Sequence, residues 1–388
     1  KNLDFVITGM HTKSDNIELQ TAKKNRIPIY SYPEFIRKSS DNKHRIVIAG
    51  SHGKTTITSM ILHVLHDNNI KVDYLLGAKI DSTHNLVSLE NNDVIVIEGD
   101  EYFSSALDKR SKFTHYNPDV LVVSGVEWDH VNVFPTLELY QDTFRNILNI
   151  TSQKSKQIFY CGDDLFLSHL LTTTNYIQPY YLPKYKIENG QFIIMYESEE
   201  IPLNIFGKHN LYNLEAARLV ALQLGVCKRQ FYKSIQSFKG AEKRLNLIKN
   251  NPHKNSSVFY DFAHSPSKVA ATINAVKELF PNRYLVACLQ LYTFSSLNIN
   301  FIPNYANVFK DANEVWIYID EISIQEKNKE KISNEFLLDV ISHDKIRIIK
   351  DKNNLKRYLY DFQCENSNLL LMSSGNFSNI NLMAIFSG

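Results

Sequence analysis

The sequence predicts an α/β protein in which helices cover parallel sheets, divided into two or three domains. Two kinds of observation lead to this prediction. Runs of apolar and β-branched residues, such as 93–97 and 119–123, end in polar loops, and stretches with apolar residues at helical spacing separate them. In addition, 388 residues are too many for one ordinary hydrophobic core.

The composition is that of an ordinary globular protein. Hydrophobic residues make up 44% and charged residues 22%, and the formal net charge is +2, which gives no case for nucleic acid or an anionic membrane as a partner. No apolar run approaches the roughly 18 residues of a membrane-spanning helix, and no signal peptide opens the sequence. The four cysteines are widely spaced. We therefore expect a cytoplasmic protein with reduced thiols and no membrane insertion.

Residues 1–42 predict the end of an α/β domain. A strand at 5–8, a helix at 17–24 and a short strand at 27–29 precede a capped helical turn around 32–36. These are too few strands to form an independent sheet.

The strongest functional signal opens the second region, residues 43–239. A β-branched run at 45–49 enters the turn Gly50-Ser51-His52-Gly53-Lys54-Thr55-Thr56, and a segment with helical spacing leaves it. Gly50 and Gly53 allow a tight turn whose N–H groups face one anion, and the helix N-terminus adds partial positive charge. This pattern predicts a phosphate-binding loop.

Lys54 and Thr55 indicate which phosphates it binds. Lys54 would reach the outer phosphates of a nucleoside triphosphate, and the Thr55 hydroxyl would hold Mg²⁺. The spacing differs from the common phosphate loop, because only two residues separate Gly50 from Gly53 and Ile48 takes the place of the first glycine. The preceding strand and following helix nevertheless favour nucleotide binding over a chance match.

The next two predicted buried strands also end in polar residues, Glu98-Gly99-Asp100-Glu101-Tyr102 and Glu127-Trp128-Asp129-His130. Ligands bind beyond the carboxyl ends of parallel strands, so we expect both clusters to converge with the phosphate loop. There Glu98 would suit Mg²⁺, and His130 would be a metal-facing imidazole. Without that placement, both would be read as surface or structural residues.

Residues 158–206 predict antiparallel hairpins, because turns and alternating apolar residues replace the buried runs. Gly207-Lys208-His209-Asn210-Leu211-Tyr212-Asn213 then leads into a helix at 214–224. Asn210 is either a helix cap or, through its amide, a contact to an adenine edge. A domain boundary is expected at Gly240.

Residues 240–388 predict another α/β unit, with a helix at 268–279 and strands at 258–262, 284–289, 314–318, 345–349 and 369–372. Lys243 and Arg244 are either solvated charges or cations that reach phosphates across a cleft. Asp261 either binds a ribose hydroxyl or caps the turn before Pro266.

Six motifs, in this order, resemble those of the Mur ligases, the ATP-dependent amide-forming enzymes of peptidoglycan synthesis. They are Gly50 to Thr56, Glu98 to Tyr102, Glu127 to His130, Gly207 to Asn213, Lys243-Arg244-Leu245, and Asp261-Phe262-Ala263-His264-Ser265-Pro266. Within the family, residues 108–116 look most like the murein peptide ligases, and the ligases that add L-alanine are the next most similar.

The resemblance implies a fold of three domains. Residues 1–42 would be the remnant of an N-terminal UDP-binding Rossmann-like domain, since the glycine-rich turn that opens this domain in the family is absent. Residues 43–239 would form the central P-loop ATPase domain, and residues 240–388 a C-terminal Rossmann-like domain.

The resemblance also implies a reaction with ATP and Mg²⁺ as cofactors. The lactyl carboxylate of UDP-N-acetylmuramate would form an acyl phosphate and then an amide with L-alanyl-γ-D-glutamyl-meso-diaminopimelate. L-Alanine is the alternative amine, and a non-catalytic nucleotide-binding regulatory protein is the alternative from another class. The sequence does not decide between a monomer and a dimer.

Roles in the family pass to matching residues of this chain. The catalytic set would be Lys54, Glu98, His130 and Arg244. Mg²⁺ would be held by Thr55, Glu98 and His130. The nucleotide would be bound by Gly50, Ser51, His52, Gly53, Lys54, Thr55, Thr56, Asn210, Asn213, Arg244 and Asp261, with Asn213 on the adenine. The substrate would be contacted by Asp100, Glu101, His264, Gln290 and Ser374.

Three departures from the family pattern lie in the C-terminal domain. Ser265 replaces a second histidine, residues 290–294 lack the histidine and arginine of relatives, and residues 373–377 only approximate their C-terminal loop. The last two segments face the incoming amine in the family, so the resemblance leaves the identity of the amine open.

Overall fold

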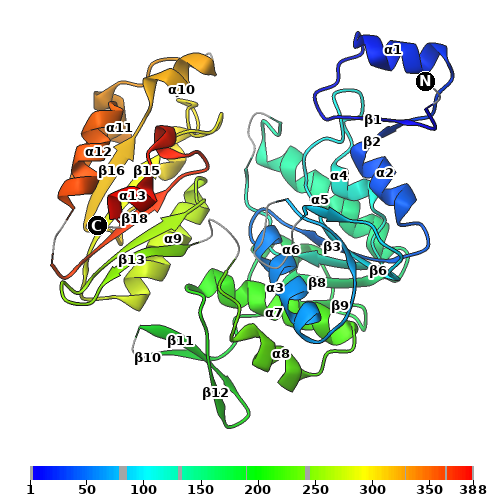
Figure 1. The fold of residues 1–388 in the computed structure, drawn as a ribbon, viewed down its shortest axis with the longest axis horizontal. Coiled ribbons are helices and arrows are strands. Elements are labelled where there is room, and N and C mark those ends of the chain that lie inside the picture. Colours follow the sequence, from blue (N-terminus) through cyan, green and yellow to red (C-terminus); the bar gives the residue numbers. More distant parts are fainter. Residues whose placement is uncertain are drawn as a thin grey trace. The chain divides into compact units, whose positions relative to one another are not determined.

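The computed structural model describes residues 3–77, 85–129, 133–188, 190–240, 245–327, 329–362 and 365–386. The chain forms two compact units (Figure 1). The first consists of Lys1–Trp128, Val133–Pro183 and Tyr212–Ile235, and the second of Asp129–Asn132, Lys184–Leu211 and Gln236–Gly388. Both units contain helices and a mainly parallel sheet, which confirms the predicted α/β class. In these ranges, no helix has the length and apolar character needed to cross a membrane.

The first unit begins with a small parallel strand pair. Its elements are β1 (Val6–Thr8), α1 (Ile17–Lys24), β2 (Ile29–Ser31) and α2 (Tyr32–Ser39). Ser31 and Glu34 form a capping box that fixes the start of α2, which explains why the chain turns into a helix directly after β2. The predicted first strand and both helices are confirmed, whereas β2 lies two residues later than predicted.

A seven-stranded sheet forms the centre of the described part of this unit, in the order β5-β4-β6-β3-β7-β8-β9. All neighbouring strands are parallel except β4 and β5. The strands are β3 (His44–Ala49), β4 (Asp73–Leu75), β5 (Val87–Ser88), β6 (Val94–Glu98), β7 (Val120–Val123), β8 (Gln157–Cys161) and β9 (Ile177–Tyr180). The runs at 46–49, 95–97 and 120–123 are buried, as their apolar sequence predicts.

Helices cover this sheet. They are α3 (Lys54–Asp67), α4 (Lys112–His115), α5 (Leu137–Ser152), α6 (Leu165–Leu170), the part of α7 (Lys208–Gln223) that starts at Tyr212, and α8 (Lys228–Ile235). Phe144 and Ile147 of α5 pack with Val47 and Ile97 of the sheet in one buried cluster. Because β6, β3 and β7 are neighbouring parallel strands, their carboxyl ends lie side by side.

Asp119 joins two strands at the opposite edge. Its carboxylate accepts hydrogen bonds from the Arg45 N–H (3.0 Å) and the Lys156 ammonium (2.8 Å). Partial burial, the largest influence, raises the pKa of Asp119, but these donors lower it to a net value below the ordinary 3.8.

Asp119→Asn is therefore expected to destabilise the protein by about 1.5–3 kcal/mol at pH 7, as for a charged hydrogen bond. A carboxyl group whose pKa is lowered on folding stabilises fully above its unfolded pKa and loses this contribution as the pH falls through its folded pKa. The difference between wild type and variant in urea unfolding should thus be constant above about pH 4.5 and shrink below pH 3.8. A difference that grows on acidification would contradict this explanation.

The second unit contains a three-stranded antiparallel sheet of β10 (Tyr185–Glu188), β11 (Gln191–Tyr196) and β12 (Glu199–Pro202). The hairpins predicted for 158–206 are thus correct only for the second half. The first half is wrong, because β8 and β9 pair in parallel with the large sheet of the first unit. The short strand β9 contains a glutamine and a proline, and the tyrosine-rich, turn-rich sequence that follows favoured hairpins for the whole segment.

A six-stranded sheet, in the order β13-β14-β18-β15-β16-β17, forms the core of the described part of the second unit. The strands are β13 (Asn246–Asn251), β14 (Ser256–Asp261), β15 (Tyr284–Gln290), β16 (Glu314–Tyr318), β17 (Ile346–Ile349) and β18 (Ser367–Met372). All five predicted strands are confirmed. The antiparallel edge strand β13 was not predicted, because its sequence is polar and a bulge interrupts its pairing.

Two groups of helices pack in separate clusters against this sheet. One cluster contains residues of α9 (Pro266–Leu279), η1 (Ile302–Tyr305), α10 (Glu321–Glu326) and α11 (Asn334–Val340), and the other residues of α12 (Lys352–Asp361), η2 (Phe377–Asn379) and α13 (Leu382–Phe386). The connection after β15 leads to the first group and the connection after β18 to the second. The neighbouring ends of β15 and β18 are therefore a topological switch point, where α/β sheets bind ligands.

Candidate active site

The predicted phosphate loop joins β3 to α3. Its backbone is left-handed at Gly50 (φ +129°) and Gly53 (φ +76°), a conformation that favours glycine. A Cβ atom at Gly50 would collide with Ser124, and one at Gly53 with the amide of Asn213. The loop is thus packed tightly between two neighbouring segments. It leads directly into α3, whose first-turn N–H groups are the donors that such a site offers to phosphate.

Lys54 folds back over this loop. Its ammonium donates to the Gly50 carbonyl (2.6 Å) and to Glu101 Oε2 (2.7 Å), a carboxylate whose side chain is fully buried. Burial, the largest influence, lowers the pKa of Lys54, but the surrounding carboxylates, led by Glu101, raise it to a net value above normal. Lys54 is therefore a fixed positive charge at the mouth of the loop.

Thr55 and Glu98 provide hard oxygen ligands next to the loop. The Thr55 hydroxyl donates to Glu98 Oε1 (2.8 Å), and Glu98 Oε2 accepts from the Gly77 N–H (2.9 Å). A hydroxyl and a carboxylate beside a phosphate-binding loop are the donor set that Mg²⁺ uses together with phosphate and water. The residues present therefore fit the predicted magnesium site, and β6 does bring Glu98 to the loop, as predicted.

A hydrogen-bonded network supports the loop from behind. Ser51 Oγ lies 2.8 Å from Tyr140 OH and accepts from the Glu127 N–H (2.8 Å), while Tyr140 OH donates to Glu101 (3.4 Å). His52 Nε2 is 2.8 Å from Glu127 Oε2. Sequence reasoning gave no role to Tyr140 or Glu127. Glu127 stood inside a recognised motif, but nothing in the sequence of α5 pointed to Tyr140.

Asp100 and Thr56 were also predicted as site residues, but neither takes part in the hydrogen bonds of Lys54 and Thr55 described above. Asp100 Oδ2 accepts from Lys112 of α4 (2.6 Å), so its carboxylate is engaged in an ion pair. Thr56 is buried in the first turn of α3. The structure thus brings together Gly50 to Thr55, Glu98, Glu101 and Asn213 around one loop.

The predictions for His130, Lys243 and Arg244 lie outside the described residues. Asn210 belongs to the second unit, where its side chain donates to the Phe206 carbonyl (2.8 Å). The predicted helix-cap role is not what this bond shows, because Asn210 is the third residue of α7 and its amide nitrogen donates to a carbonyl, whereas a cap accepts from a backbone N–H.

Asp261 and His264 follow β14 in the second unit. Asp261 accepts from the Ala263 N–H (2.8 Å) and the Thr272 hydroxyl (3.1 Å), which agrees with the turn-capping alternative. His264 Nδ1 is 2.8 Å from the Phe262 carbonyl. Both side chains thus stabilise the connection from β14 to α9.

Gln290 ends β15 and Ser374 follows β18, so both residues lie at the switch point of the second sheet. Gln290 Oε1 accepts from Ser373 Oγ (2.6 Å) and from the Phe377 N–H (3.0 Å). Gln290 Nε2 and Ser374 Oγ are both buried, and neither has a hydrogen-bond partner among the described residues. A buried donor without a hydrogen-bond partner lowers the stability of a protein. At a strand end, such donors indicate a place where a polar ligand binds.

Residues 48–221 match the model of the Mur ligase middle domain. The UDP-N-acetylmuramate–L-alanine ligase of Aquifex aeolicus is 26% identical over 386 residues, which cover 96% of this chain and 82% of that protein. The ligase of the same name from Clostridium kluyveri is 26% identical over 395 residues, with 96% and 83% covered.

Solved structures show the same fold. The UDP-N-acetylmuramate-alanine ligase of Thermotoga maritima superimposes with a TM-score of 0.71 at 21% identity, covering 99% of this chain and 84% of that one. A murein peptide ligase of Psychrobacter arcticus gives 0.63 at 20% identity, covering 99% and 86%. The predicted special similarity to murein peptide ligases is not confirmed, because the matching curated relatives are named for L-alanine. Residues 48–221 thus match a Mur ligase middle domain, and over most of its length the chain is similar in sequence and fold to Mur ligases, which are ATP-dependent, amide-forming enzymes.

Proposed function

We propose that the protein uses ATP and Mg²⁺ to join the lactyl carboxylate of UDP-N-acetylmuramate to an amine through an acyl phosphate, in the cytoplasmic part of peptidoglycan synthesis. The observation that supports this proposal is the arrangement at the phosphate loop of the first unit. Lys54, Thr55 and Glu98 lie together there, at the carboxyl ends of β3 and β6. The proposal includes the three-domain division at 1–42, 43–239 and 240–388.

Each residue of the loop has a stated task in this reaction. Lys54 would exchange its bond to the Gly50 carbonyl for the outer phosphates, while Glu101 keeps it oriented and protonated. Thr55 and Glu98 would hold Mg²⁺, which neutralises charge on the transferring phosphoryl group when it is bound. The loop N–H groups would stabilise the same charge. His130 and Arg244 are proposed as a further metal ligand and a phosphate contact.

We favour L-alanine as the amine, because proteins of that name match over nearly the whole chain. Residues 108–116, which look like those of murein peptide ligases, motivate the tripeptide as the second candidate. The test is ADP release from ATP and UDP-N-acetylmuramate with L-alanine, the tripeptide or a tetrapeptide. Release with none of them would favour a nucleotide-binding regulatory protein.

Gln290 and Ser374 are proposed to contact the amine substrate. Gln290→Glu keeps the Oε1 acceptor that Ser373 and Phe377 use, but replaces the unsatisfied Nε2 donor by an oxygen. We expect the KM for the amine to rise roughly tenfold to a hundredfold, the range of a lost hydrogen bond to a charged group, with the KM for ATP unchanged. Steady-state kinetics would check this. Equal changes in both KM values would remove the residue from the amine site.

A further inference from the structure

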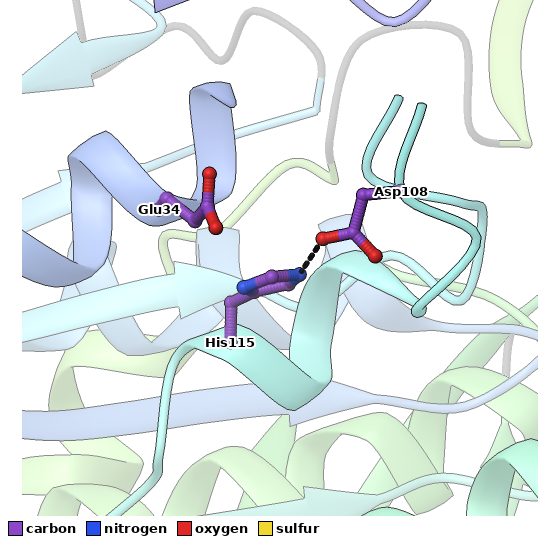
Figure 2. A group of neighbouring side chains, drawn as sticks. All are labelled: Glu34, Asp108 and His115. Carbon is purple, nitrogen blue, oxygen red and sulfur yellow. Dashed lines mark ion pairs between the residues drawn. The ribbon is translucent and has the colours of Figure 1, made fainter. Parts of the chain in front are cut away.

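Two carboxylates and one imidazole lie close together in the first unit, and none of them belongs to the phosphate loop. Glu34 comes from the first turn of α2, Asp108 from the loop before α4, and His115 from the end of α4. One ligand atom of each lies within 4.8 Å of those of the other two. Figure 2 shows the His115 ring pointing at Asp108, with the Glu34 carboxylate on the neighbouring helix directed toward the same space.

His115 is the informative member of this cluster. Its side chain is only 6% exposed, and its Nε2 lies 3.2 Å from Asp108 Oδ2. That approach lacks hydrogen-bond geometry, and Nε2 has no other hydrogen-bond partner in the described part of the chain. Burial, with a smaller contribution from Arg110, lowers the pKa of His115 despite the nearby carboxylates. Among the described residues, this buried nitrogen is therefore not used by a hydrogen bond and points into the space between the two carboxylates.

The two carboxylates already attract a cation. Arg110 lies 2.7 Å from Asp108 Oδ2 and 3.5 Å from Glu34 Oε1. The Arg110 Nε–H also donates to both carboxylate oxygens of Asp108, at 3.0 and 3.1 Å. The Arg110 side chain is 63% exposed, so it can move into solvent without leaving a buried charge behind.

We propose that Glu34, Asp108 and His115 bind one divalent transition-metal ion, with Zn²⁺ as the representative case, in place of the Arg110 guanidinium. Zn²⁺ binds imidazole nitrogen and carboxylate oxygen at about 2.0–2.1 Å, which puts two tetrahedral ligand atoms about 3.3 Å apart. The His115–Asp108 pair, at 3.2 Å, already has this spacing. Water would take the fourth position.

Such an ion would tie α2 to α4 and to the loop that precedes α4. This site is separate from the magnesium site at Thr55 and Glu98, and its donor set differs. Imidazole favours transition metals over Mg²⁺, which prefers oxygen ligands alone.

The test uses the full chain without an affinity tag, stripped of metal with a chelator and kept free of nucleotide. Titration with Co²⁺, followed by visible absorption, and with Zn²⁺, followed by calorimetry, should reveal one saturable site. His115→Gln should weaken binding at least tenfold, and Arg110→Gln should tighten it by a similar factor because it removes the competing cation. His253→Gln, at an exposed histidine outside the cluster, is the matched control.

Glu98→Gln should leave this binding unchanged, so the result is independent of whether the ligase proposal holds. Circular dichroism checks that each variant is folded. The proposal is overturned if the wild type shows no saturable site, or if folded His115→Gln binds as the wild type does. If His115→Gln does not fold, the Arg110→Gln result decides, because unchanged or weaker affinity in that variant also overturns the proposal.

Discussion

Lys54→Ala is expected to abolish amine-dependent ADP release, with a loss of at least about 10²–10³-fold in kcat, the range for removing a preorganised electrostatic contact to the reacting group. The reason is that Lys54 is the cation that the structure holds on the loop, in contact with the Gly50 carbonyl and Glu101. The measurement is coupled-assay ADP release with saturating UDP-N-acetylmuramate and amine. Release at the wild-type rate would refute the assignment of Lys54.

A second variant separates lost chemistry from lost stability. Removing Lys54 leaves the buried Glu101 carboxylate without its ion pair, which costs about 3–5 kcal/mol in comparable cases. The double variant Lys54→Ala/Glu101→Gln removes that buried charge, so it should regain most of the unfolding free energy and none of the activity. Lys156→Ala, at a lysine on the opposite edge of the sheet, is the matched control for activity.

Glu98→Gln is expected to lower kcat about 10²–10³-fold and to shift the Mg²⁺ dependence to higher concentration. The amide keeps an oxygen that can accept from Thr55 but lacks the negative charge that, in the proposed mechanism, would bind the ion. Its NH₂ group would face the Gly77 N–H, two donors together, at a cost of about 1 kcal/mol or more. Because this cost is small compared with the stability of a typical domain, the variant should stay folded, and its lower kcat would come from the site itself.

The measurement is ADP release over a range of Mg²⁺ concentrations, together with urea unfolding. Glu200→Gln, at an exposed glutamate paired with Lys186, serves as the control. An unchanged Mg²⁺ dependence in Glu98→Gln would show that the carboxylate at the end of β6 does not hold the ion.

Much of the fold and of the loop could be predicted from the sequence, because the signals are local. Consecutive β-branched residues in β3, β6 and β7 require a sheet buried on both faces, and polar residues after them must then meet at one edge. These two requirements predict that Glu98 lies beside the loop that carries Lys54 and Thr55, and the structure confirms this position. The positive φ angles of Gly50 and Gly53 were also predictable, because a tight turn between a strand and a helix needs residues without a Cβ atom.

The rest depends on contacts between distant segments, which no local pattern records. Tyr140 reaches Ser51 across 89 positions, and Lys54 finds Glu101 across 47. The ion pair between Lys54 and Glu101 was missed, because the sequence shows two charged residues but not that their side chains are in contact in the fold. Edge strand β13 was missed for another reason, since a polar strand has no apolar alternation to reveal it.

The proposed ligation is tested by ADP release from the full chain with ATP, Mg²⁺, UDP-N-acetylmuramate and each amine in turn. We expect release only when nucleotide sugar and amine are present together, with the highest rate for L-alanine and a matching amount of amide product by mass spectrometry. A higher rate with the tripeptide would change the amine and leave the ligation mechanism intact. ADP release that is equal with and without every amine, or no release at all, would refute the ligation.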